Sequence, residues 1–110
     1  MTDKRIVLTN CGSESEAEKI ANFLVEHRLA ACVNMVPRIK SVYRWQGKVE
    51  SAEEWLLLAK TTVIQVEAVC DAIRELHSYE LPEIIVIAVE GGSAEYLNWI
   101  EDSVGRTGHS

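Results

Sequence analysis

The segment that most restricts the fold of this chain is 54–60, a run typical of a β-strand that is apolar on both faces. Successive side chains of a strand point to opposite faces, so one face carries Trp55, Leu57 and Ala59 and the other carries two leucines. A sheet covered by helices on one face should instead alternate apolar and polar residues. The run 84–89 does not alternate either. We therefore expect the terminal helix and a partner subunit to cover the second face.

The composition indicates one small globular domain without nucleic-acid or membrane partners. Of the 110 residues, 47% are hydrophobic and 25% charged, which suits one core and not two. The formal net charge is −6, from 17 acidic and 11 basic residues, and Lys and Arg form no cluster that would bind a phosphate backbone. The longest apolar run, 84–89, is far shorter than a membrane span.

The cysteines indicate a reducing compartment. Cys11, Cys32 and Cys70 are odd in number, far apart and form no CxxC pair, whereas a disulfide scaffold normally has an even set. The first residues are followed by only a brief apolar stretch, which is unlike a secretory signal. We therefore expect a cytoplasmic protein.

Apolar periodicity predicts the order strand, helix, strand, strand, helix, strand and a short terminal helix. The expected strands are 6–9, 32–45, 54–60 and 84–89. Pro37 removes a ladder donor from the second strand and should mark an edge, a bulge or a bend. The helices should end near 27–28 and at 77–78.

The residues at the expected helix starts support this order. Ser13 and Glu16 have capping-box spacing before the first helix, and Ser93 can cap the last. Thr62 and Gln65 offer a second, weaker capping box.

This order is that of an α+β ferredoxin-like βαββαβ sandwich with both helices on one face of the sheet, plus an extra C-terminal helix. We assign residues 1–104 to this single domain. Residues 105–110 are polar and rich in glycine, which predicts a flexible tail.

Two aromatic side chains, Tyr43 and Trp45, lie on the same side of a strand beside the hairpin turn. Cross-strand packing would explain them. Docking on another subunit explains them equally well, because Trp, Tyr and Arg dominate interface cores. Together with Trp55 of the doubly apolar strand, they are the predicted interface residues.

The densest polar segment is 77–83, which opens with His77. A histidine at a helix end meets the free carbonyls and the helix dipole, and this is the simpler explanation. The alternative is a metal ligand completed by a thiolate or carboxylate. Among the cysteines, Cys11 is expected to be accessible because it ends a strand beside a glycine, whereas Cys32 and Cys70 are expected in the core.

Glu54 and Lys60 share a face of the third strand but lie about 20 Å apart, so they cannot pair with each other. Solvated strand ends are the simplest explanation for both charges. The sequence contains no Ser–His–Asp set, phosphate loop or GxGxxG. We therefore expect a protein that is not an enzyme.

Five segments together resemble the CutA family of divalent-cation tolerance proteins, in family order and spacing from about residue 6 to residue 100. They are LAACVN (29–34), YRWQG (43–47), LAKTT (58–62), LHSYELPEI (76–84) and YLNW (96–99). The resemblance implies a ferredoxin-like subunit in a tight homotrimer, similar to the PII signalling proteins, and tolerance to copper and other divalent metals. We expect the sheet to be extended between subunits at the strand that Pro37 interrupts.

The resemblance also implies ligand-binding residues. Glu54, Lys60, Tyr79 and Trp99 match positions similar to the family's polar residues near the subunit clefts, and are the candidate pocket residues.

The metal ligands implied by the resemblance are only partly present. Some relatives have a cysteine late in the first strand and paired histidines after the second helix, where this chain has Thr9, and Leu76 followed by His77. Ser78 also replaces a proline that the family usually has. His77, with Cys11 as a substitute, is thus the predicted ligand set for a divalent metal, copper foremost.

Three functions are compatible with these features, in this order of preference. The first is a non-enzymatic metal-tolerance protein that binds divalent cations weakly at surface or inter-subunit positions. The second is a PII-like sensor that holds a small metabolite in the subunit cleft, where Lys60 would meet an anionic group. The third is an enzyme such as an acylphosphatase, which needs an arginine in the loop after the first strand, and 10–13 contains none.

Overall fold

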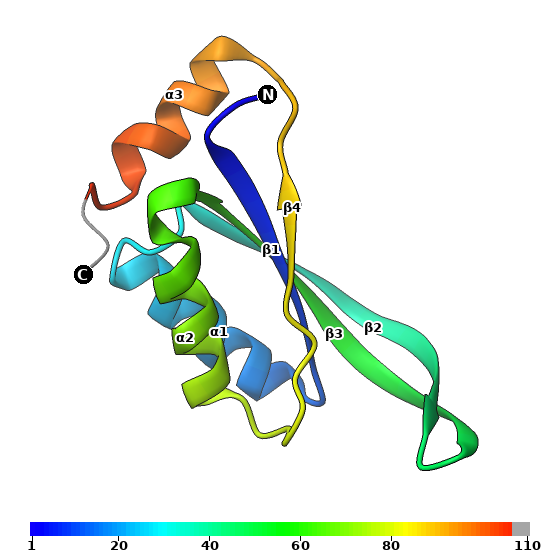
Figure 1. Ribbon diagram of the computed structural model, residues 1–110. Helices are drawn as coiled ribbons and strands as arrows, with labels where there is room; N and C mark the ends of the chain where they lie inside the picture. The colour runs from blue at the N-terminus through cyan, green and yellow to red at the C-terminus, as the bar shows by residue number, and fades with distance from the viewer. Residues whose placement is uncertain (107–110) are drawn as a thin grey trace.

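Four antiparallel strands form a single sheet in the order β2-β3-β1-β4 (Figure 1). The computed structural model describes residues 1–106. The strands are β1 (Lys4–Cys11), β2 (Cys32–Trp45), β3 (Lys48–Thr62) and β4 (Ile85–Ala88). The helices are α1 (Glu14–Glu26), α2 (Val66–Leu76) and α3 (Ala94–Ser103), with a 3-10 turn, η1 (Val63–Gln65), before α2. This is the predicted α+β ferredoxin-like order with an additional C-terminal helix.

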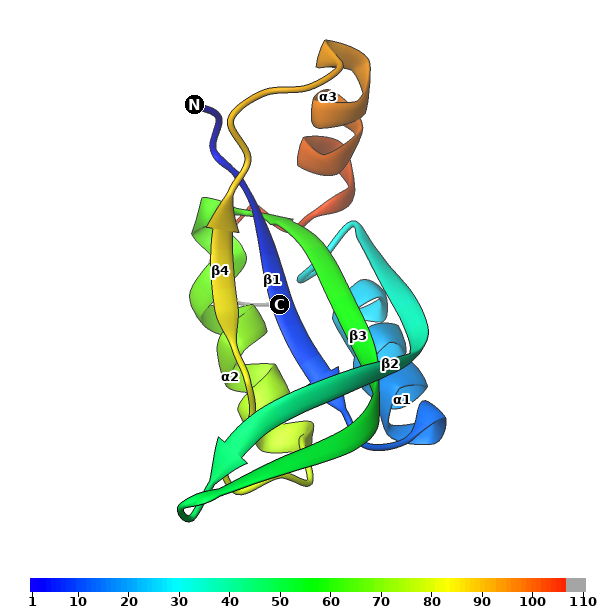
Figure 2. The same ribbon diagram turned by 90° about the vertical axis from the view of Figure 1, so that its right-hand side faces the viewer.

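Helices α1 and α2 lie on one face of the sheet, behind the strands in Figure 2. Each helix carries one apolar stripe, and these stripes meet the odd-numbered residues of β1 and β3. The core between the layers consists of fully buried apolar side chains, notably Val7, Ala17, Ile20, Leu24, Leu57, Ala59, Val69 and Ile73. The helices therefore satisfy only one of the two apolar faces of β3.

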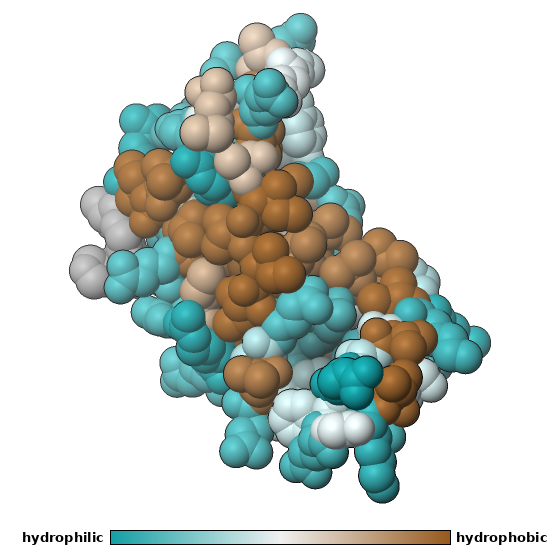
Figure 3. All heavy atoms as spheres, turned by 45° about the vertical axis from the view of Figure 1, so that its right-hand side comes forward, coloured by the Kyte–Doolittle hydropathy of each residue, from teal (hydrophilic) through white to brown (hydrophobic). Residues whose placement is uncertain are grey.

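The opposite face of the sheet is open and apolar. Ile6 pairs with Ile87 and Leu8 with Ile85 across β1 and β4. The β4 residues Ile87 and Ile85 are 42% and 48% exposed. Figure 3 shows apolar residues gathered over this part of the molecule. We refer to this surface as the open face. The sequence predicted this second apolar surface.

The terminal helix contacts only one end of the open face. Lys4 donates a hydrogen bond to Glu101 at 2.9 Å, and Lys60 donates one to the Tyr96 hydroxyl at 3.1 Å. Ile100 and Val104 of this segment form a separate small apolar cluster with Ala31. Most of the open face is therefore left without a cover from residues 1–106.

Strands β2 and β3 form a long hairpin that continues beyond the helices (Figure 2). The register shifts between Val36 and Ile39, at the bulge that Pro37 predicts, and Arg38 has a φ of 54°. At the tip, Gln46 and Gly47 have φ values of 48° and 80°, as a type I′ turn requires. The third strand begins at Lys48, six residues before the predicted start at Glu54. The prediction missed 48–53 because this segment is mostly polar and gives no apolar signal of a strand.

The helix starts confirm two of the three predicted caps. The Ser13 Oγ accepts a hydrogen bond from the Glu16 N–H at 3.2 Å, and the Ser93 Oγ accepts one from Tyr96 N–H at 3.3 Å. The predicted capping box at Thr62 is wrong, because the chain makes the 3-10 turn η1 there and no side chain caps it.

Gly105, the first residue of the predicted flexible tail, is bound to the domain by two hydrogen bonds. Gly105 donates its N–H to the Arg28 carbonyl at 2.8 Å, and its own carbonyl accepts from Gln65 Nε2 at 2.8 Å. These bonds attach Gly105 to the domain, so the predicted boundary at 104 lies inside the packed chain. Residues 107–110 of the predicted tail lie outside the described part. Within 1–106, no helix has the length and apolar character needed to cross a bilayer.

Candidate functional site

His77 joins the end of β1 to the end of α2. It follows the last helical residue, and its side chain is buried. Its Nε2 lies 2.6 Å from the Asn10 carbonyl oxygen, and its Nδ1 accepts the Tyr79 N–H at 3.1 Å. A carbonyl can only accept, so Nε2 carries the proton and Nδ1 is the bare nitrogen. Both ring nitrogens are therefore engaged.

Cys11, Glu16 and His77 form a compact polar cluster in which their ligand atoms all lie within 4.8 Å of one another. A Glu16 Oε1 lies 3.4 Å from His77 Nδ1 and is buried without a hydrogen-bond partner in the described chain. The predicted ligands His77 and Cys11 are thus neighbours. Sequence reasoning read Glu16 only as a helix-cap residue, because the turn that brings it to His77 gives no sequence signal.

The accessibility predicted for Cys11 is wrong. Its side chain is fully buried between the sheet and α1, whereas Cys32, predicted in the core, is half-buried. Burial raises the pKa of the Cys11 thiol to about 12, and the carboxylates of Glu16 and Glu54 add to the shift. The thiol is therefore protonated at neutral pH.

The Cys11–Glu16–His77 cluster has the donor types that a borderline divalent ion uses, namely sulfur, oxygen and nitrogen. However, a metal ligand must be deprotonated and must offer a free lone pair. Cys11 holds its proton, and the unprotonated nitrogen of His77, Nδ1, already accepts a hydrogen bond from the Tyr79 N–H. These residues consequently fit a weakly bound ion that displaces a proton, and they do not fit a permanently held metal centre.

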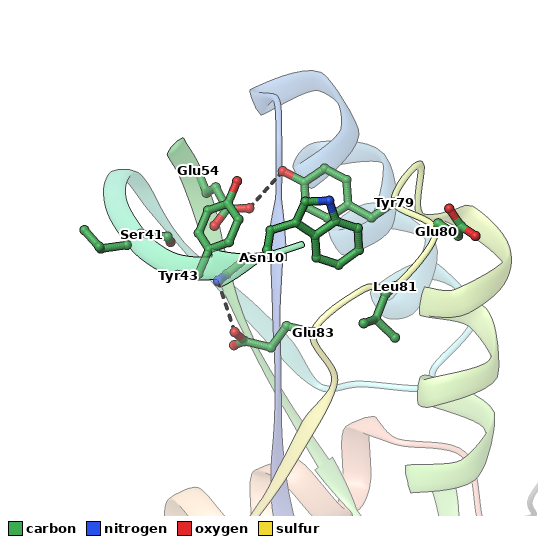
Figure 4. A pocket seen from close by; sticks show the side chains of 10 residues that line it. Asn10, Ser41, Tyr43, Glu54, Tyr79, Glu80, Leu81 and Glu83 are labelled. Atoms are coloured by element: carbon green, nitrogen blue, oxygen red, sulfur yellow. Dashed lines mark hydrogen bonds between the residues drawn. The ribbon is translucent and has the colours of Figure 1, made fainter. Parts of the chain in front are cut away.

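A cavity of about 630 Å³ lies beside this cluster, between the β2–β3 hairpin and the segment that joins α2 to β4 (Figure 4). We refer to it as the acidic cavity. Its wall contains three aromatic rings, three carboxylates, and a few apolar and neutral polar residues. They are Tyr43, Trp45, Tyr79, Glu54, Glu80, Glu83, Val42, Leu81, Asn10 and Ser41.

Glu54 is the most deeply placed charge of the acidic cavity. It is only 7% exposed, so the predicted solvated strand end is wrong for this residue. The Tyr79 hydroxyl donates to Glu54 Oε2 at 2.8 Å (Figure 4). Burial, followed by this hydrogen bond to a carboxylate, raises the pKa of Tyr79 above its ordinary value. Tyr79 therefore stays a hydrogen-bond donor to Glu54.

Gly12 makes room for this contact. A Cβ at this position would lie 2.9 Å from the Tyr79 hydroxyl, closer than such atoms approach in proteins. A side chain at position 12 would therefore displace the Tyr79 hydroxyl from its present place. Sequence reasoning placed Gly12 in a loop but did not assign it this steric role.

The four predicted pocket residues divide between the two ends of the molecule. Glu54 and Tyr79 line the acidic cavity, whereas Lys60 and Trp99 do not. Lys60 bonds the Tyr96 hydroxyl, and Trp99 packs beside the Tyr96 ring with 5.3 Å between centroids. The second pair therefore lies at α3.

The predicted interface residues also divide. Tyr43 and Trp45 are 42% and 46% exposed and line the acidic cavity from the hairpin. Trp55 is half-buried and packs against the core under the helices. Residues of the hairpin are thus available to contacts outside the chain. The Trp55 ring packs within the chain, but its indole Nε1 is buried without a hydrogen-bond partner among the described residues.

Comparison with known proteins identifies the family. A sequence profile of the CutA1 divalent ion tolerance protein matches residues 5–103. The divalent-cation tolerance protein CutA of Thermus thermophilus is 44% identical over 102 residues, which cover 93% of this chain and 99% of that protein. Protein CutA of Homo sapiens is 46% identical over 90 residues, 82% of this chain, but the match spans only 50% of the human protein.

The solved structures agree. The crystal structure of CutA from Xylella fastidiosa superimposes with a TM-score of 0.92 at 41% identity, covering 94% of this chain and 100% of that one. Related proteins are named as chloroplastic in Arabidopsis thaliana and as periplasmic in Archaeoglobus fulgidus, so the compartment varies. The fold and these similarities over most of the sequence lead to one conclusion: the chain belongs to the CutA1 divalent ion tolerance family.

Proposed function

We propose that this protein acts in divalent-cation tolerance as a non-enzymatic homotrimer that binds copper and similar ions weakly. The observation that carries the proposal is the convergence of Cys11, Glu16 and His77 within 4.8 Å in a member of this family. Catalysis is not part of the proposal, because the histidine of this cluster is held by two hydrogen bonds and its thiol is buried and protonated. The three free cysteines support a reducing, cytoplasmic location.

Copper is proposed first among the divalent ions because nitrogen and sulfur donors bind Cu²⁺ more strongly than its neighbours in the first row. Titration of the purified protein with Cu²⁺, Zn²⁺ and Mg²⁺, followed by calorimetry, should rank them in that order. Glu16→Gln keeps the shape of the side chain and removes its charge. It should weaken Cu²⁺ binding at least about tenfold, the effect of losing even an outer-shell partner.

Glu14→Gln provides the matched control, because Glu14 lies in the first turn of the same helix and is exposed. It should bind Cu²⁺ as the wild type does. If Glu16→Gln also retains wild-type affinity, the cluster is not the copper site.

The open face supports assembly with further copies of the chain. Exposed apolar side chains rarely form a continuous surface on a monomer. β2 is an edge strand of the sheet, so it can accept strand pairing from another subunit, as the Pro37 bend suggested. Sedimentation velocity at micromolar concentration should give the mass of three chains.

The trimer can be tested with two equally exposed positions. Ile87 on the open face and Val25 on α1 are each 42% exposed. Ile87→Glu should shift the protein towards monomers, whereas Val25→Glu should leave the mass unchanged. A wild-type protein that sediments as a monomer would refute the homotrimer.

A second candidate function is a PII-like sensor that holds a small molecule. The acidic cavity favours it, because a volume of about 630 Å³ falls within the range of small-molecule sites. Any ligand bound by the native state must raise its melting temperature. A metabolite screen in which no compound does so would count against this candidate.

A further inference from the structure

We propose that the acidic cavity binds a small organic cation, an ammonium group that carries an apolar arm. The inference rests on the second candidate function, ligand binding in the cleft, and does not depend on the metal cluster. It differs from the sequence-based expectation of an anionic ligand at Lys60, because Lys60 lies outside the wall of this cavity.

The charge of the wall selects the sign of the ligand. Glu54, Glu80 and Glu83 line the cavity, and no Lys, Arg or His is among its lining residues. Within residues 1–106, no ion pair joins any of these three carboxylates to a cation. Among the residues that the structure describes, Glu83 accepts one side-chain hydrogen bond, from the Asn10 amide at 3.4 Å. An anion would be repelled by these carboxylates, most by the buried Glu54 because Glu80 and Glu83 are exposed to water, whereas a cation would be attracted.

The burial of Glu54 is a second, independent observation. A carboxylate removed from water is costly unless it is paired or fully hydrogen-bonded. Glu54 is 7% exposed, and its one hydrogen bond in residues 1–106 reaches Oε2 from Tyr79. Oε1 accepts no hydrogen bond from residues 1–106 and is not among their fully buried unpartnered atoms, and the side chain forms part of the cavity wall (Figure 4). An N–H or quaternary ammonium group at this point would supply the missing positive charge.

Asn10 presents a further acceptor beside Glu54. Its Oδ1 is buried and lacks a hydrogen-bond partner among the described residues, while its amide nitrogen is used by Glu83. The lining of the cavity therefore contains acceptor oxygens and no cationic side chain, although Asn10 would have to turn for its buried Oδ1 to reach a ligand. This is the pattern expected for a ligand that donates or is positively charged.

The aromatic residues account for the organic character of the ligand. Tyr43, Trp45 and Tyr79 line the same cavity as the carboxylates. Aromatic faces attract ammonium groups through the ring quadrupole, and Trp is the most effective of them. Val42 and Leu81 add apolar surface for a hydrocarbon arm. The walls thus match both parts of the proposed ligand.

A metal ion fits this cavity less well than an organic cation. The one group of three or more His, Cys, Asp or Glu ligand atoms that converges within residues 1–106 is Cys11, Glu16 and His77. The carboxylates of Glu54, Glu80 and Glu83 do not converge in this way. An organic cation does not need these carboxylates to converge on one point.

The test uses the intact assembled protein and two probes of the same shape. Choline carries a quaternary ammonium, and 3,3-dimethyl-1-butanol replaces its charged nitrogen with carbon. Calorimetry should detect choline binding and show at least about tenfold weaker binding of the neutral probe, the discrimination expected when a buried carboxylate meets a charge.

Variants locate the site. Glu54→Gln should weaken choline binding about tenfold or more, and Trp45→Leu about threefold to tenfold through loss of its ring face. Glu53→Gln is the matched control, because Glu53 is the exposed neighbour of Glu54 on the same strand and should bind normally. Circular dichroism melting confirms that each variant is folded.

Three results would overturn the proposal: no choline binding by the wild type, equal binding of the neutral probe, or unchanged binding by Glu54→Gln. The copper titration of Glu16→Gln remains separate, so failure of the metal site and failure of this cavity are distinguishable. A cavity filled by another subunit of the assembled protein would produce the first of these results.

Discussion

At the scale of single residues, burial raises the pKa of three side chains, and Cys70 on α2 is one of them. The other two, the Cys11 thiol and the Tyr79 hydroxyl, belong to the candidate site, and their pKa values are also raised. For such groups the unfolded chain loses its proton first as the pH rises. The stability that they contribute is therefore complete below the unfolded pKa and is lost as the pH rises through the folded pKa.

This predicts a protein that loses stability on the alkaline side. For Cys11 the loss should begin near pH 9.0, the ordinary thiol pKa, and continue to about 12. Melting temperatures measured between pH 8 and pH 11 should fall less steeply for Cys11→Ala than for the wild type. Cys32→Ala, at a half-buried thiol, should follow the wild-type curve. Identical slopes for Cys11→Ala and the wild type would contradict the burial argument.

The hydrogen bond from Tyr79 to Glu54 predicts a second residue-scale effect. Tyr79→Phe leaves a buried carboxylate without its donor and should lower the free energy of unfolding by about 1–3 kcal/mol. Tyr96→Phe also removes a hydroxyl, but that hydroxyl accepts from the ammonium of Lys60 in an exposed place, and the loss should stay within about 1 kcal/mol. Urea denaturation compares the two variants. Equal losses would mean that burial of Glu54 adds nothing.

At the scale of elements, local signals were predictable from the sequence and long-range ones were not. The caps at Ser13 and Ser93 were correct because a cap depends on residues within one turn. The outer half of β3 was missed, since 48–53 is stabilised by pairing with β2 and not by an apolar pattern of its own. The η1 turn was missed because the spacing of Thr62 and Gln65 resembles a capping box, whereas the Thr62 side chain makes no cap bond in the structure.

The site shows the same division. Cys11 and His77 were predicted as ligands from the sequence, and they do lie close together. Glu16 could not be placed beside them, because that contact requires the β1–α1 turn and the end of α2 to meet. It also grouped Lys60 with Glu54, although only Glu54 reaches the acidic cavity. The alternation of side chains along the strand predicts that Glu54 and Lys60 share one face of the sheet. It does not predict at which end of the strand a cavity forms.

The Ser13 cap provides a prediction for α1 as an element. Ser13→Ala removes the acceptor of the Glu16 N–H and should lower the free energy of unfolding by about 0.5–2 kcal/mol. Ser13→Asp keeps an acceptor at the same position and should retain most of the stability. Thermal and urea unfolding of both variants measure the difference. A Ser13→Asp loss as large as that of Ser13→Ala would show that the cap is not responsible.

At the scale of the whole molecule, one sheet face is satisfied by helices and the other is not. If identical subunits cover the open face, unfolding is coupled to dissociation and the melting temperature depends on protein concentration. Tenfold dilution should therefore lower the melting temperature of the wild type. Ile87→Glu should melt lower and lose this dependence. A melting temperature independent of concentration over a hundredfold range would contradict assembly through this face.

Tyr79 belongs to both halves of the site, since its backbone N–H bonds His77 while its hydroxyl bonds Glu54. An ion that binds Nδ1 of His77 would break the hydrogen bond of the Tyr79 N–H. A cation that attracts Glu54 would weaken the hydrogen bond of the Tyr79 hydroxyl. Thermodynamic linkage then requires reciprocity: whatever factor the first ligand imposes on the affinity of the second, the second imposes on the first. A single tyrosine would thus be enough to make metal load and cleft occupancy report on each other.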